Sequence, residues 1–369
     1  MDGNGGAITK DRAYLRRGEG FGLDAIGVGK LGIMEGEPRN EQHDDRGNAR
    51  AKANAEGSEA RQADGRQADR CERIVAEGWH RRCGSDHAEI VALKKAGAAA
   101  KGARLYVTLE PCFHYGRTSP CVDEVIRSGV REVVIAMKDP NPLTNGKSIA
   151  KLRRAGIPTR VGLMEKAAMR INEVFVKYIK TGMPFVAVKC AQSLDGKIAT
   201  AAGHSQWITS SKSRDYARRI RDEFDAICVG VNTVLRDDPR LNGAKKIKRL
   251  IKIILDSSLQ TPLTARLFKG VRPADCIIAV TRKALPATIK QFQQRGVRVI
   301  VSPVKDGRVD LKWLLKAFAK EEITSILMEG GAHVIGSALK EKLVDKLYIY
   351  VAPKIIGDQN ALSSVVGVD

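Results

Sequence analysis

From residue 73 onward, short apolar runs rich in β-branched residues alternate with segments of helical periodicity. A first series contains the runs RIVAEGWH, ARLYVTLE, REVVIAM and IPTRVGLM, separated by the helical segments HAEIVALKKAGAAA, CVDEVIRSG and GKSIAKLRRAG. Strands that alternate with helices predict a mostly parallel sheet that is covered by helices on both faces. A second series of the same kind begins near residue 182, after a helical connector over about residues 165–181. Because 369 residues suffice for two cores, we predict an α/β fold with two domains, at 73–181 and 182–369.

Residues 1–72 differ in composition from the rest of the chain. The stretch Glu37–Arg70 consists almost entirely of Asn, Gln, Asp, Arg, Ala, Gly and Glu, without an apolar period of 2 or 3.6. A segment of this composition cannot bury a hydrophobic core. We therefore expect residues 1–72 to form an atypical, disordered segment with little packed structure and few contacts with the residues after 73.

The sequence contains no apolar run long enough to span a membrane, and its N-terminus lacks the pattern of a secretory signal. These features predict a cytoplasmic protein. Seven cysteines are an odd number spread thinly over the chain, which favours reduced thiols or metal ligands over a disulfide framework.

The formal net charge of +21 indicates an affinity for anions. A nucleic acid would satisfy it, and so would small phosphorylated substrates and cofactors. Aromatic residues make up only 5% of the chain and do not interleave with the basic ones, so no stacking platform for single strands is apparent. We rank nucleic acid second to a small phosphorylated partner.

Residues 87–121 gather the side chains that bind metals. His87 and Glu89 lie at the start of a predicted helix, and Cys112 and Cys121 follow the next predicted strand, the first of them after Pro111. Zinc deaminases use this arrangement, with one His and two Cys as ligands and the Glu as proton carrier. Three protein ligands leave a fourth position for a water that the metal acidifies. His-x-Glu alone is most often a solvated pair, but together with Pro-Cys in this order it predicts a hydrolytic deaminase.

The eight residues between the two cysteines exceed the two that are usual in cytidine and tRNA deaminases. The text TLEPCFHYGRTSPC, followed by MKDPNP, resembles the deaminase half of the bifunctional diaminohydroxyphosphoribosylaminopyrimidine deaminase and 5-amino-6-(5-phosphoribosylamino)uracil reductase family of riboflavin biosynthesis. The text CAQSLDGKIATAAGHSQWIT resembles the opening of the reductase half, and the likeness extends over residues 73 to about 357.

The resemblance implies a cytidine-deaminase-like zinc domain followed by a dihydrofolate-reductase-like domain. It implies zinc-dependent deamination of 2,5-diamino-6-(5-phosphoribosylamino)pyrimidin-4(3H)-one, and then NADPH-dependent reduction of the ribosyl group to ribityl. One zinc ion per chain and NADPH are the implied cofactors.

The resemblance also assigns site residues. His87, Cys112 and Cys121 are the implied zinc ligands, and Glu89 is the implied catalytic proton donor. The implied deaminase substrate contacts are His80, His114, Arg117, Asp139 and Asn141. The implied NADP contacts are Ala191, Trp207, Thr233, Asp237, Ser257, Gly331, Ala332, His333, Val334, Ile335, Gly336 and Ser337. The implied reductase substrate contacts are Ser205, Arg221, Leu241 and Glu329.

Several of these residues also have a purely structural reading. Arg117 could be an ordinary surface arginine, and residues 139–142 a rigid turn. Trp207 could be a core aromatic, and Ser257 a turn hydroxyl after a strand.

The chain departs from the family pattern in three places. The helix and strand carrying TSPNPxVG are not written in residues 1–72, and we interpret part of this segment as a frameshifted reading of them. The basic residue expected after DDPRLT is missing from DDPRLNGAKK. The sequence given ends soon after APKIIG, whereas members of the family continue through a segment that contains a further strand. We therefore expect a deaminase sheet without its first strand, an impaired deaminase, and a reductase domain truncated at its C-terminus.

Two other functions remain as alternatives. A nucleic-acid base deaminase with a binding domain predicts a Cys-x-x-Cys spacing and exposed aromatics, and neither is seen. A zinc-stabilised binding module without activity predicts four protein ligands, whereas three are apparent. We expect a phosphorylated pyrimidine as partner and no membrane, and the sequence leaves a homo-oligomer open.

Overall fold

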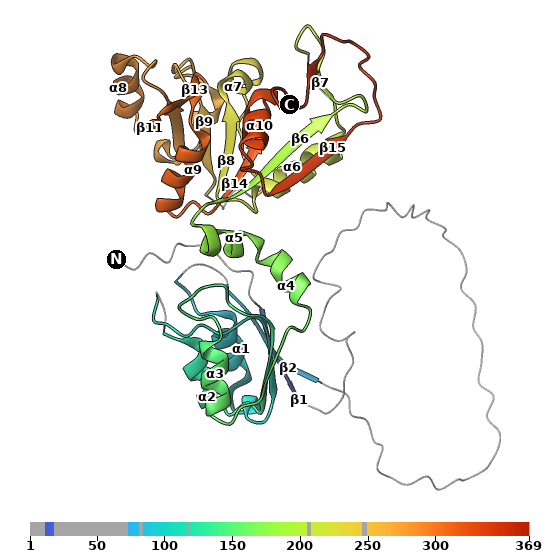
Figure 1. The fold of residues 1–369 in the computed structure, drawn as a ribbon, viewed down its shortest axis with the longest axis vertical. Helices are drawn as coiled ribbons and strands as arrows, with labels where there is room; N and C mark the ends of the chain where they lie inside the picture. Colours follow the sequence, from blue (N-terminus) through green and yellow to red (C-terminus); the bar gives the residue numbers. More distant parts are fainter. Residues whose placement is uncertain are drawn as a thin grey trace, which may run out of the picture.

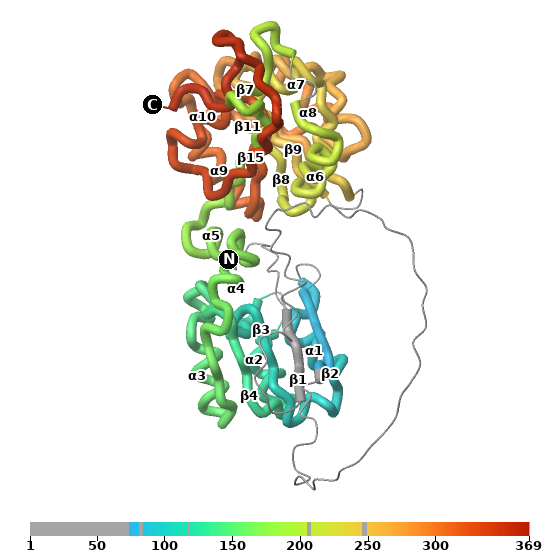
Figure 2. The backbone as a smooth tube through the Cα atoms, turned by 90° about the vertical axis from the view of Figure 1, so that its right-hand side faces the viewer, coloured from blue at the N-terminus to red at the C-terminus, as the bar shows by residue number. Residues whose placement is uncertain are grey.

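The computed structural model describes residues 12–17, 73–80, 84–116, 119–204, 208–245 and 249–368. Figure 1 shows two α/β bodies, which are joined by the helices α4 (Glu165–Ile171) and α5 (Glu173–Thr181). The tube in Figure 2 follows the same connection from a perpendicular direction. In the described residues no helix is long and apolar enough to cross a membrane.

The N-terminal body is built on a five-stranded sheet with the order β2-β1-β3-β4-β5. The strands β3, β4 and β5 run parallel, and β1 pairs antiparallel with both β2 and β3. The strands are β1 (Arg12–Arg17), β2 (Arg73–Trp79), β3 (Arg104–Leu109), β4 (Glu132–Met137) and β5 (Thr159–Val161). The helices of this body are α1 (Ala88–Ala96), the 3-10 turn η3 (Gly97–Ala100), α2 (Cys121–Arg127) and α3 (Lys147–Arg154).

The expectation that this sheet lacks its first strand is wrong. Residues 12–17 fill the position between β2 and β3, and Tyr14 is the register partner of both Glu77 and Tyr106. The backbone groups along the facing edges of β2 and β3 need partners, and a third strand supplies them. The compositional argument rested on Glu37–Arg70 and overlooked a six-residue segment outside that stretch. The rest of the expectation falls on residues 1–11 and 18–72, which lie outside the described part of the chain.

Close packing of β2 on α1 depends on Gly78. A Cβ atom at this position would lie 2.2 Å from the carbonyl oxygen of Ala88 and 2.6 Å from the backbone nitrogen of Ala92. Only a residue without a side chain allows the strand to approach the helix so closely. This contact fixes the end of β2, where His80 lies, against the start of α1.

The C-terminal body contains a seven-stranded sheet with the order β11-β10-β9-β8-β14-β6-β15, and all its strand pairs are parallel. This confirms the predicted parallel sheet. Its strands are β6 (Phe185–Gln192), β8 (Ala226–Gly230), β9 (Ile251–Leu255), β10 (Cys276–Val280), β11 (Arg298–Val301), β14 (Ser325–Glu329) and β15 (Lys346–Val351). Its helices are α6 (Ser211–Arg221), α7 (Val231–Asp237), α8 (Pro286–Gln294), α9 (Leu311–Lys320) and α10 (Ala332–Lys340).

Four short strands and two 3-10 turns complete this body. The strands form the pairs β12 (Val304–Lys305) with β13 (Arg308–Val309), and β7 (Lys197–Ala199) with β16 (Leu362–Ser363). The turns are η4 (Arg266–Phe268) and η5 (Pro273–Asp275).

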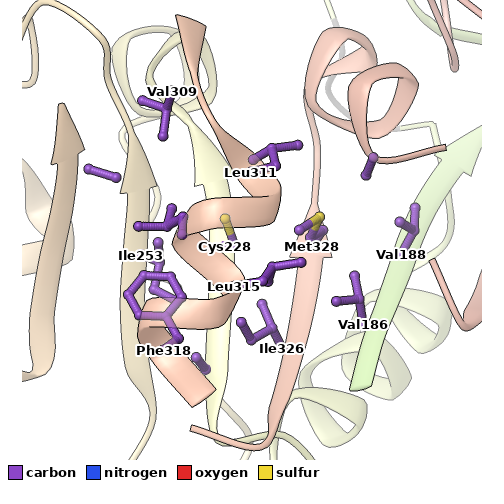
Figure 3. Packing of buried hydrophobic residues seen from close by; sticks show 14 of the residues in the cluster. Val186, Val188, Cys228, Ile253, Val309, Leu311, Leu315, Phe318, Ile326 and Met328 are labelled. Carbon is purple, nitrogen blue, oxygen red and sulfur yellow. The ribbon is translucent and has the colours of Figure 1, made fainter. Parts of the chain in front are cut away.

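The largest core cluster lies between α9 and the central strands of the seven-stranded sheet. Leu311, Leu315 and Phe318 project from α9 onto Ile253 and Ile326 (Figure 3). All five side chains are at most 5% exposed. Burial of this apolar surface holds the sheet rigid, so that the ends of its strands can position side chains for a site.

Candidate functional site

The N-terminal body holds a cluster of three metal-type ligands. His87 immediately precedes α1 with an extended backbone, Cys112 lies in the loop after β3, and Cys121 is the first residue of α2. His87 Nδ1 is 3.2 Å from Cys121 Sγ and 3.5 Å from Cys112 Sγ. All three ligand atoms lie within 4.8 Å of one another, and no other group of three or more such ligands occurs in the described ranges.

The geometry of this cluster fits a zinc ion. With Zn–S near 2.3 Å and Zn–N near 2.0 Å, tetrahedral coordination separates donor atoms by roughly 3.5 Å. The separations of His87 Nδ1 from the two sulfurs, 3.2 Å and 3.5 Å, agree with this figure. One nitrogen and two sulfur donors also leave the open fourth position of a catalytic site, as opposed to the closed shell of a structural one.

The surroundings of Cys112 favour its thiolate form, which is the form that binds metals. Its contact with Cys121 lowers the pKa of the Cys112 thiol to about 4, against the opposing effect of burial, and His87 adds to the lowering. The backbone N–H of Cys121 donates to Cys112 Sγ at 3.2 Å, and the N–H of Val122 donates to the carbonyl oxygen of Cys112 at 3.3 Å. The start of α2 therefore fixes Cys112 and stabilises its negative charge.

Glu89 lies in the first turn of α1, two residues after the ligand His87. Its side chain is buried, with 6% exposed. Its carboxylate is close in sequence to the ligand His87 but does not belong to the cluster of three ligands. That is the placement expected of a proton carrier.

His80 contacts the ligand His87, and His114 contacts Thr144. The rings of His80 and His87 meet edge to face with centroids 5.1 Å apart, and His80 Nδ1 is 3.2 Å from the carbonyl oxygen of Asp86. Burial lowers the pKa of His80, so its neutral form is favoured at neutral pH. His114 Nδ1 lies 3.2 Å from Oγ1 of the fully buried Thr144.

Asp139 and Asn141 build the turn that the sequence suggested. Asp139 Oδ1 accepts the N–H of Asn141 at 2.8 Å, and Asn141 Oδ1 accepts the N–H of Leu143 at 3.0 Å. Both side chains are buried. The structural reading of these residues as a rigid turn therefore holds. Arg117 lies outside the described residues.

Sequence reasoning missed Glu110, which organises this turn. Its carboxylate is 2% exposed and accepts the N–H of Asp139 at 3.2 Å and the N–H of Gly146 at 3.0 Å. Glu110 therefore fixes the turn and the start of α3 relative to the metal loop. An acidic residue at the end of a buried strand, directly before Pro111, was the available signal.

A cavity of about 740 Å³ in the C-terminal body contains three of the expected reductase substrate residues, namely Arg221, Leu241 and Glu329. Arg221 Nε donates to Glu329 Oε1 at 2.7 Å, and Arg221 Nη2 donates to Glu329 Oε2 at 2.8 Å. Although burial opposes the charge, the carboxylate of Glu329 raises the pKa of Arg221. Ser205 lies outside the described residues.

A second cavity, of about 620 Å³, contains six of the expected NADP residues. They are Thr233, Ser257, Gly331, His333, Val334 and Ser337. The others are placed differently or are not described. Ala332, Ile335 and Gly336 are buried on the inner side of α10, Asp237 lines the first cavity, Ala191 lines neither cavity, and Trp207 lies outside the described residues.

The two cavities meet at Thr233 and the Gly330–Gly331 turn. Thr233 lines both, Gly330 lines the first, and Gly331 lines the second. Both glycines have positive φ, and a Cβ atom at Gly330 would lie 3.1 Å from Thr233 Oγ1. The turn therefore requires glycine and keeps the boundary between the cavities thin.

The second cavity suits a phosphate-rich cofactor. It lies at the carboxyl ends of the parallel strands β8, β9 and β14, where the N-terminus of α10 begins. A helix start with bare glycine amides favours anions. The basic side chains that line it are Lys305, Arg308, His333 and Lys340.

Lys189 is a further residue that sequence reasoning missed. It lies on β6 next to Glu329 of β14 in the strand register, and it lines the first cavity. Its ammonium is 5.5 Å from the ring centroid of Tyr350. The signal was a single lysine within the otherwise apolar run FVAVKCA.

Comparisons with known proteins find similar proteins for both halves of the chain. Residues 184–369 match the family described as RibD C-terminal domain, and residues 68–137 match the cytidine and deoxycytidylate deaminase zinc-binding region. The riboflavin biosynthesis protein RibD of Aquifex aeolicus is 44% identical over 288 residues, which is 78% of this chain and 79% of the relative. That of Escherichia coli is 38% identical over 311 residues, which is 80% of this chain and 83% of the relative.

Solved structures of RibD-type proteins also resemble this chain over both bodies. Acinetobacter baumannii RibD superposes with a TM-score of 0.70 at 36% identity, covering 80% of this chain and 81% of that one. A diaminohydroxyphosphoribosylaminopyrimidine deaminase/5-amino-6-(5-phosphoribosylamino)uracil reductase from Thermotoga maritima superposes with a TM-score of 0.69 at 33% identity, with the same coverage.

Proposed function

Since the chain belongs to the RibD family of riboflavin biosynthesis proteins, we propose that its two domains catalyse consecutive steps at the two sites described above. The chain is a bifunctional enzyme with a zinc-dependent deaminase activity and an NADPH-dependent reductase activity. The substrate we assign to the first step is 2,5-diamino-6-(5-phosphoribosylamino)pyrimidin-4(3H)-one. The second step converts the ribosyl group of the deaminated product to a ribityl group.

In the deaminase site, we assign His87, Cys112 and Cys121 as the zinc ligands. Zinc, when bound there, supplies Lewis-acid chemistry that makes water nucleophilic near neutral pH. Glu89 takes a proton from the attacking water and returns protons to the ring nitrogen and the departing amino group. The mutual distances of the three ligand atoms support this assignment.

Recognition of the pyrimidine and its ribosyl phosphate we assign to other side chains of the N-terminal body. His80, in its neutral form, donates Nδ1–H to the carbonyl oxygen of Asp86 and so offers an acceptor at Nε2, and His114 is oriented by Thr144. Asp139 and Asn141 provide a turn that Glu110 keeps in place. We assign these four residues, together with Arg117, to binding, and Glu110 to positioning.

In the reductase site, NADPH supplies the hydride when it is bound in the second cavity. The substrate sugar occupies the first cavity, so that its reacting carbon lies at the boundary near Thr233. Glu329, held in orientation by Arg221, accepts hydrogen bonds from sugar hydroxyls. The ribosylamine ring of the substrate opens to an imine, and its ring oxygen leaves the reacting carbon as a hydroxyl. The hydride adds to the imine carbon, and Lys189 Nζ, beside Glu329 in the sheet, donates a proton to the imine nitrogen.

The observation that carries the two-step proposal is that one chain holds both an open three-ligand metal cluster and a pair of adjoining cavities. We also propose that the protein acts in the cytoplasm, where thiols stay reduced; all five described cysteines are free. The partner is a small phosphorylated pyrimidine.

A chelator experiment tests whether the two domains catalyse their reactions independently. Removal of the metal should stop ammonia release from the diaminopyrimidine substrate and leave NADPH oxidation with the deaminated compound unchanged. Re-addition of zinc should restore ammonia release. If NADPH oxidation stops together with ammonia release, the two sites are not independent and the proposal fails.

A further inference from the structure

The turn over residues 193–196, with the sequence SLDG, joins β6 to β7 and lines neither cavity of the C-terminal body. Its Asp195 is exposed, yet both carboxylate oxygens accept backbone groups from a segment 161 residues away. Asp195 Oδ1 accepts the N–H of Ile356 at 3.1 Å, and Asp195 Oδ2 accepts the N–H of Gly357 at 2.9 Å. The hydroxyl of Ser193, and then these two amides, lower the pKa of Asp195, so the carboxylate stays charged over the physiological range.

Further bonds fasten the same segment, residues 352–367, which we call the strap. The N–H of Leu194 donates to the carbonyl oxygen of Lys354 at 2.7 Å, and the N–H of Ser364 donates to that of Gly196 at 2.9 Å. Between these points β16 of the strap pairs antiparallel with β7. Figure 1 shows the strap running from β15 past β7 and back to α10. The turn therefore holds the strap along most of its length.

The last part of the strap lies against α10, at the wall of the second cavity. The N–H of Val366 donates to the carbonyl oxygen of Ala332 at 3.4 Å, and a Cβ atom at Gly336 would lie 1.9 Å from the carbonyl oxygen of Val366. Val366 and Gly367 line the second cavity, and no residue of the strap lines the first. The position of the strap therefore shapes the cofactor cavity beside the start of α10 and leaves the substrate cavity unaffected.

We propose, on the basis of the reductase function assigned above, that Asp195 is a positioning residue for NADPH, because it holds the strap against α10. Asp195 does not touch the cofactor itself. Only molecules with the strap in place have a complete second cavity, so the apparent affinity for NADPH falls with the fraction of such molecules. By linkage, bound NADPH in turn stabilises the strap in this position.

Steady-state kinetics of NADPH oxidation with the deaminated compound test this role. Asp195→Ala removes both acceptors and should raise KM for NADPH about threefold or more, while kcat and KM for the deaminated compound stay the same. Asp195→Asn keeps one acceptor oxygen and should recover part of the loss. Glu321→Ala removes another exposed carboxylate of the same body, outside both cavities, and should leave KM for NADPH unchanged.

Limited digestion with trypsin reports on the strap without any turnover. Lys354 is the only lysine or arginine in residues 352–369, so cleavage after it releases the single peptide 355–369. Mass spectrometry should show that NADPH slows the release of this peptide from wild type. Without NADPH, the peptide should be released faster from Asp195→Ala than from wild type, because the strap leaves the turn more often.

Lys197 provides a second variant that leaves Asp195 intact. Lys197 Nζ donates to the carbonyl oxygen of Ala361 and to Ser363 Oγ, both at 3.3 Å, and thus joins β7 to the strap. Lys197→Met should raise KM for NADPH and speed the release of peptide 355–369, as Asp195→Ala does. Agreement between the two variants excludes a misfolded Asp195 variant as the cause.

Failure of this inference is distinct from failure of the reductase assignment. If wild type does not oxidise NADPH with the deaminated compound, the reductase assignment fails, and the digestion still decides whether the cofactor stabilises the strap. Wild-type KM for NADPH and wild-type peptide release in both Asp195→Ala and Lys197→Met would overturn the inference. A loss of kcat without a rise in KM for NADPH would also overturn it, since Asp195 would then merely support the fold.

Discussion

Arg221 on α6 and Glu329 at the end of β14, which are 108 residues apart in the sequence, form a bidentate ion pair. Its two nitrogen–oxygen distances are 2.7 Å and 2.8 Å. The side chains are 17% and 9% exposed. Arg221 Nη1 also donates to the carbonyl oxygen of Asn242 at 2.9 Å. This pair joins a helix, a strand end and a loop on one side of the substrate cavity, so it serves both the fold and the site.

Glu329→Ala should therefore destabilise the reductase domain as well as inactivate it. The substitution leaves the buried guanidinium of Arg221 without its counter-charge, which costs about 3–5 kcal/mol. Thermal unfolding should show a lower midpoint, and NADPH oxidation should be lost. Glu329→Gln keeps an acceptor for one Arg221 donor and should unfold at a temperature between the two. An Ala variant as stable as wild type would contradict the structural role of the pair.

Cys112→Ser should remove most of the bound zinc. A hydroxyl does not ionise near neutral pH, so the site loses one of its two anionic ligands. Metal analysis of the purified protein should give about one zinc per chain for wild type and much less for the variant. Cys190→Ala, which changes a buried thiol of the other domain, should keep the full content. Unchanged zinc in Cys112→Ser would refute the ligand assignment.

Glu89→Gln should keep the zinc and lose the deaminase activity. The amide is nearly isosteric with the carboxylate but cannot carry a proton, so ammonia release should fall by roughly 10²–10⁴-fold. NADPH oxidation with the deaminated compound should persist, since Glu89 belongs to the other body. Loss of zinc in this variant would show that Glu89 acts through the metal shell and not as a proton carrier.

Gly336→Ala should weaken NADPH binding. Alanine in a helix is ordinarily more favourable than glycine by about 1 kcal/mol. Here the new Cβ atom would lie 1.9 Å from the carbonyl oxygen of Val366, so the segment around Val366 must move. Val366 and Gly367 line the second cavity, and KM for NADPH should rise while ammonia release stays constant. An unchanged KM for NADPH together with raised stability would mean that the segment around Val366 moves without disturbing the second cavity, and it would contradict this prediction.

Much of the fold and the metal cluster could be predicted from the sequence because the signals are local. Period and length distinguish the strands of both sheets from the helices between them. His87 and Glu89 share one helix start, and Cys112 and Cys121 flank a single loop, so the order of these residue types matches the zinc-deaminase pattern and indicates that they meet. The Gly330–Gly331 break between strand and helix likewise predicts an anion site at α10.

The parts that sequence reasoning missed depend on contacts between distant segments. Glu110 gives no sign that its carboxylate binds the N–H of Gly146, 36 residues away. Lys252 appears as a lone lysine in an apolar strand until Arg240 and Leu267 place carbonyl oxygens beside it. The position of β1 between β2 and β3 is set by backbone pairing, to which the composition of residues 1–72 gives no guide.

The presence of β1 also bears on the expected impairment of the deaminase. That expectation rested partly on an unpaired edge in the sheet, and the described strand occupies the position. The absence of the family sequence TSPNPxVG from residues 1–72 remains as the ground for it. Ammonia release by the wild-type chain therefore decides whether the deaminase is active.

One assay on the purified, zinc-loaded chain tests the central claim most directly. The diaminopyrimidine phosphate substrate is incubated with and without NADPH, and ammonia and the reduced ribityl product are quantified separately. The account predicts ammonia release in both reactions and ribityl product only with NADPH, in an amount no greater than the ammonia. Ribityl product without ammonia release, or ammonia release that depends on NADPH, would contradict two successive steps at two separate sites of one chain.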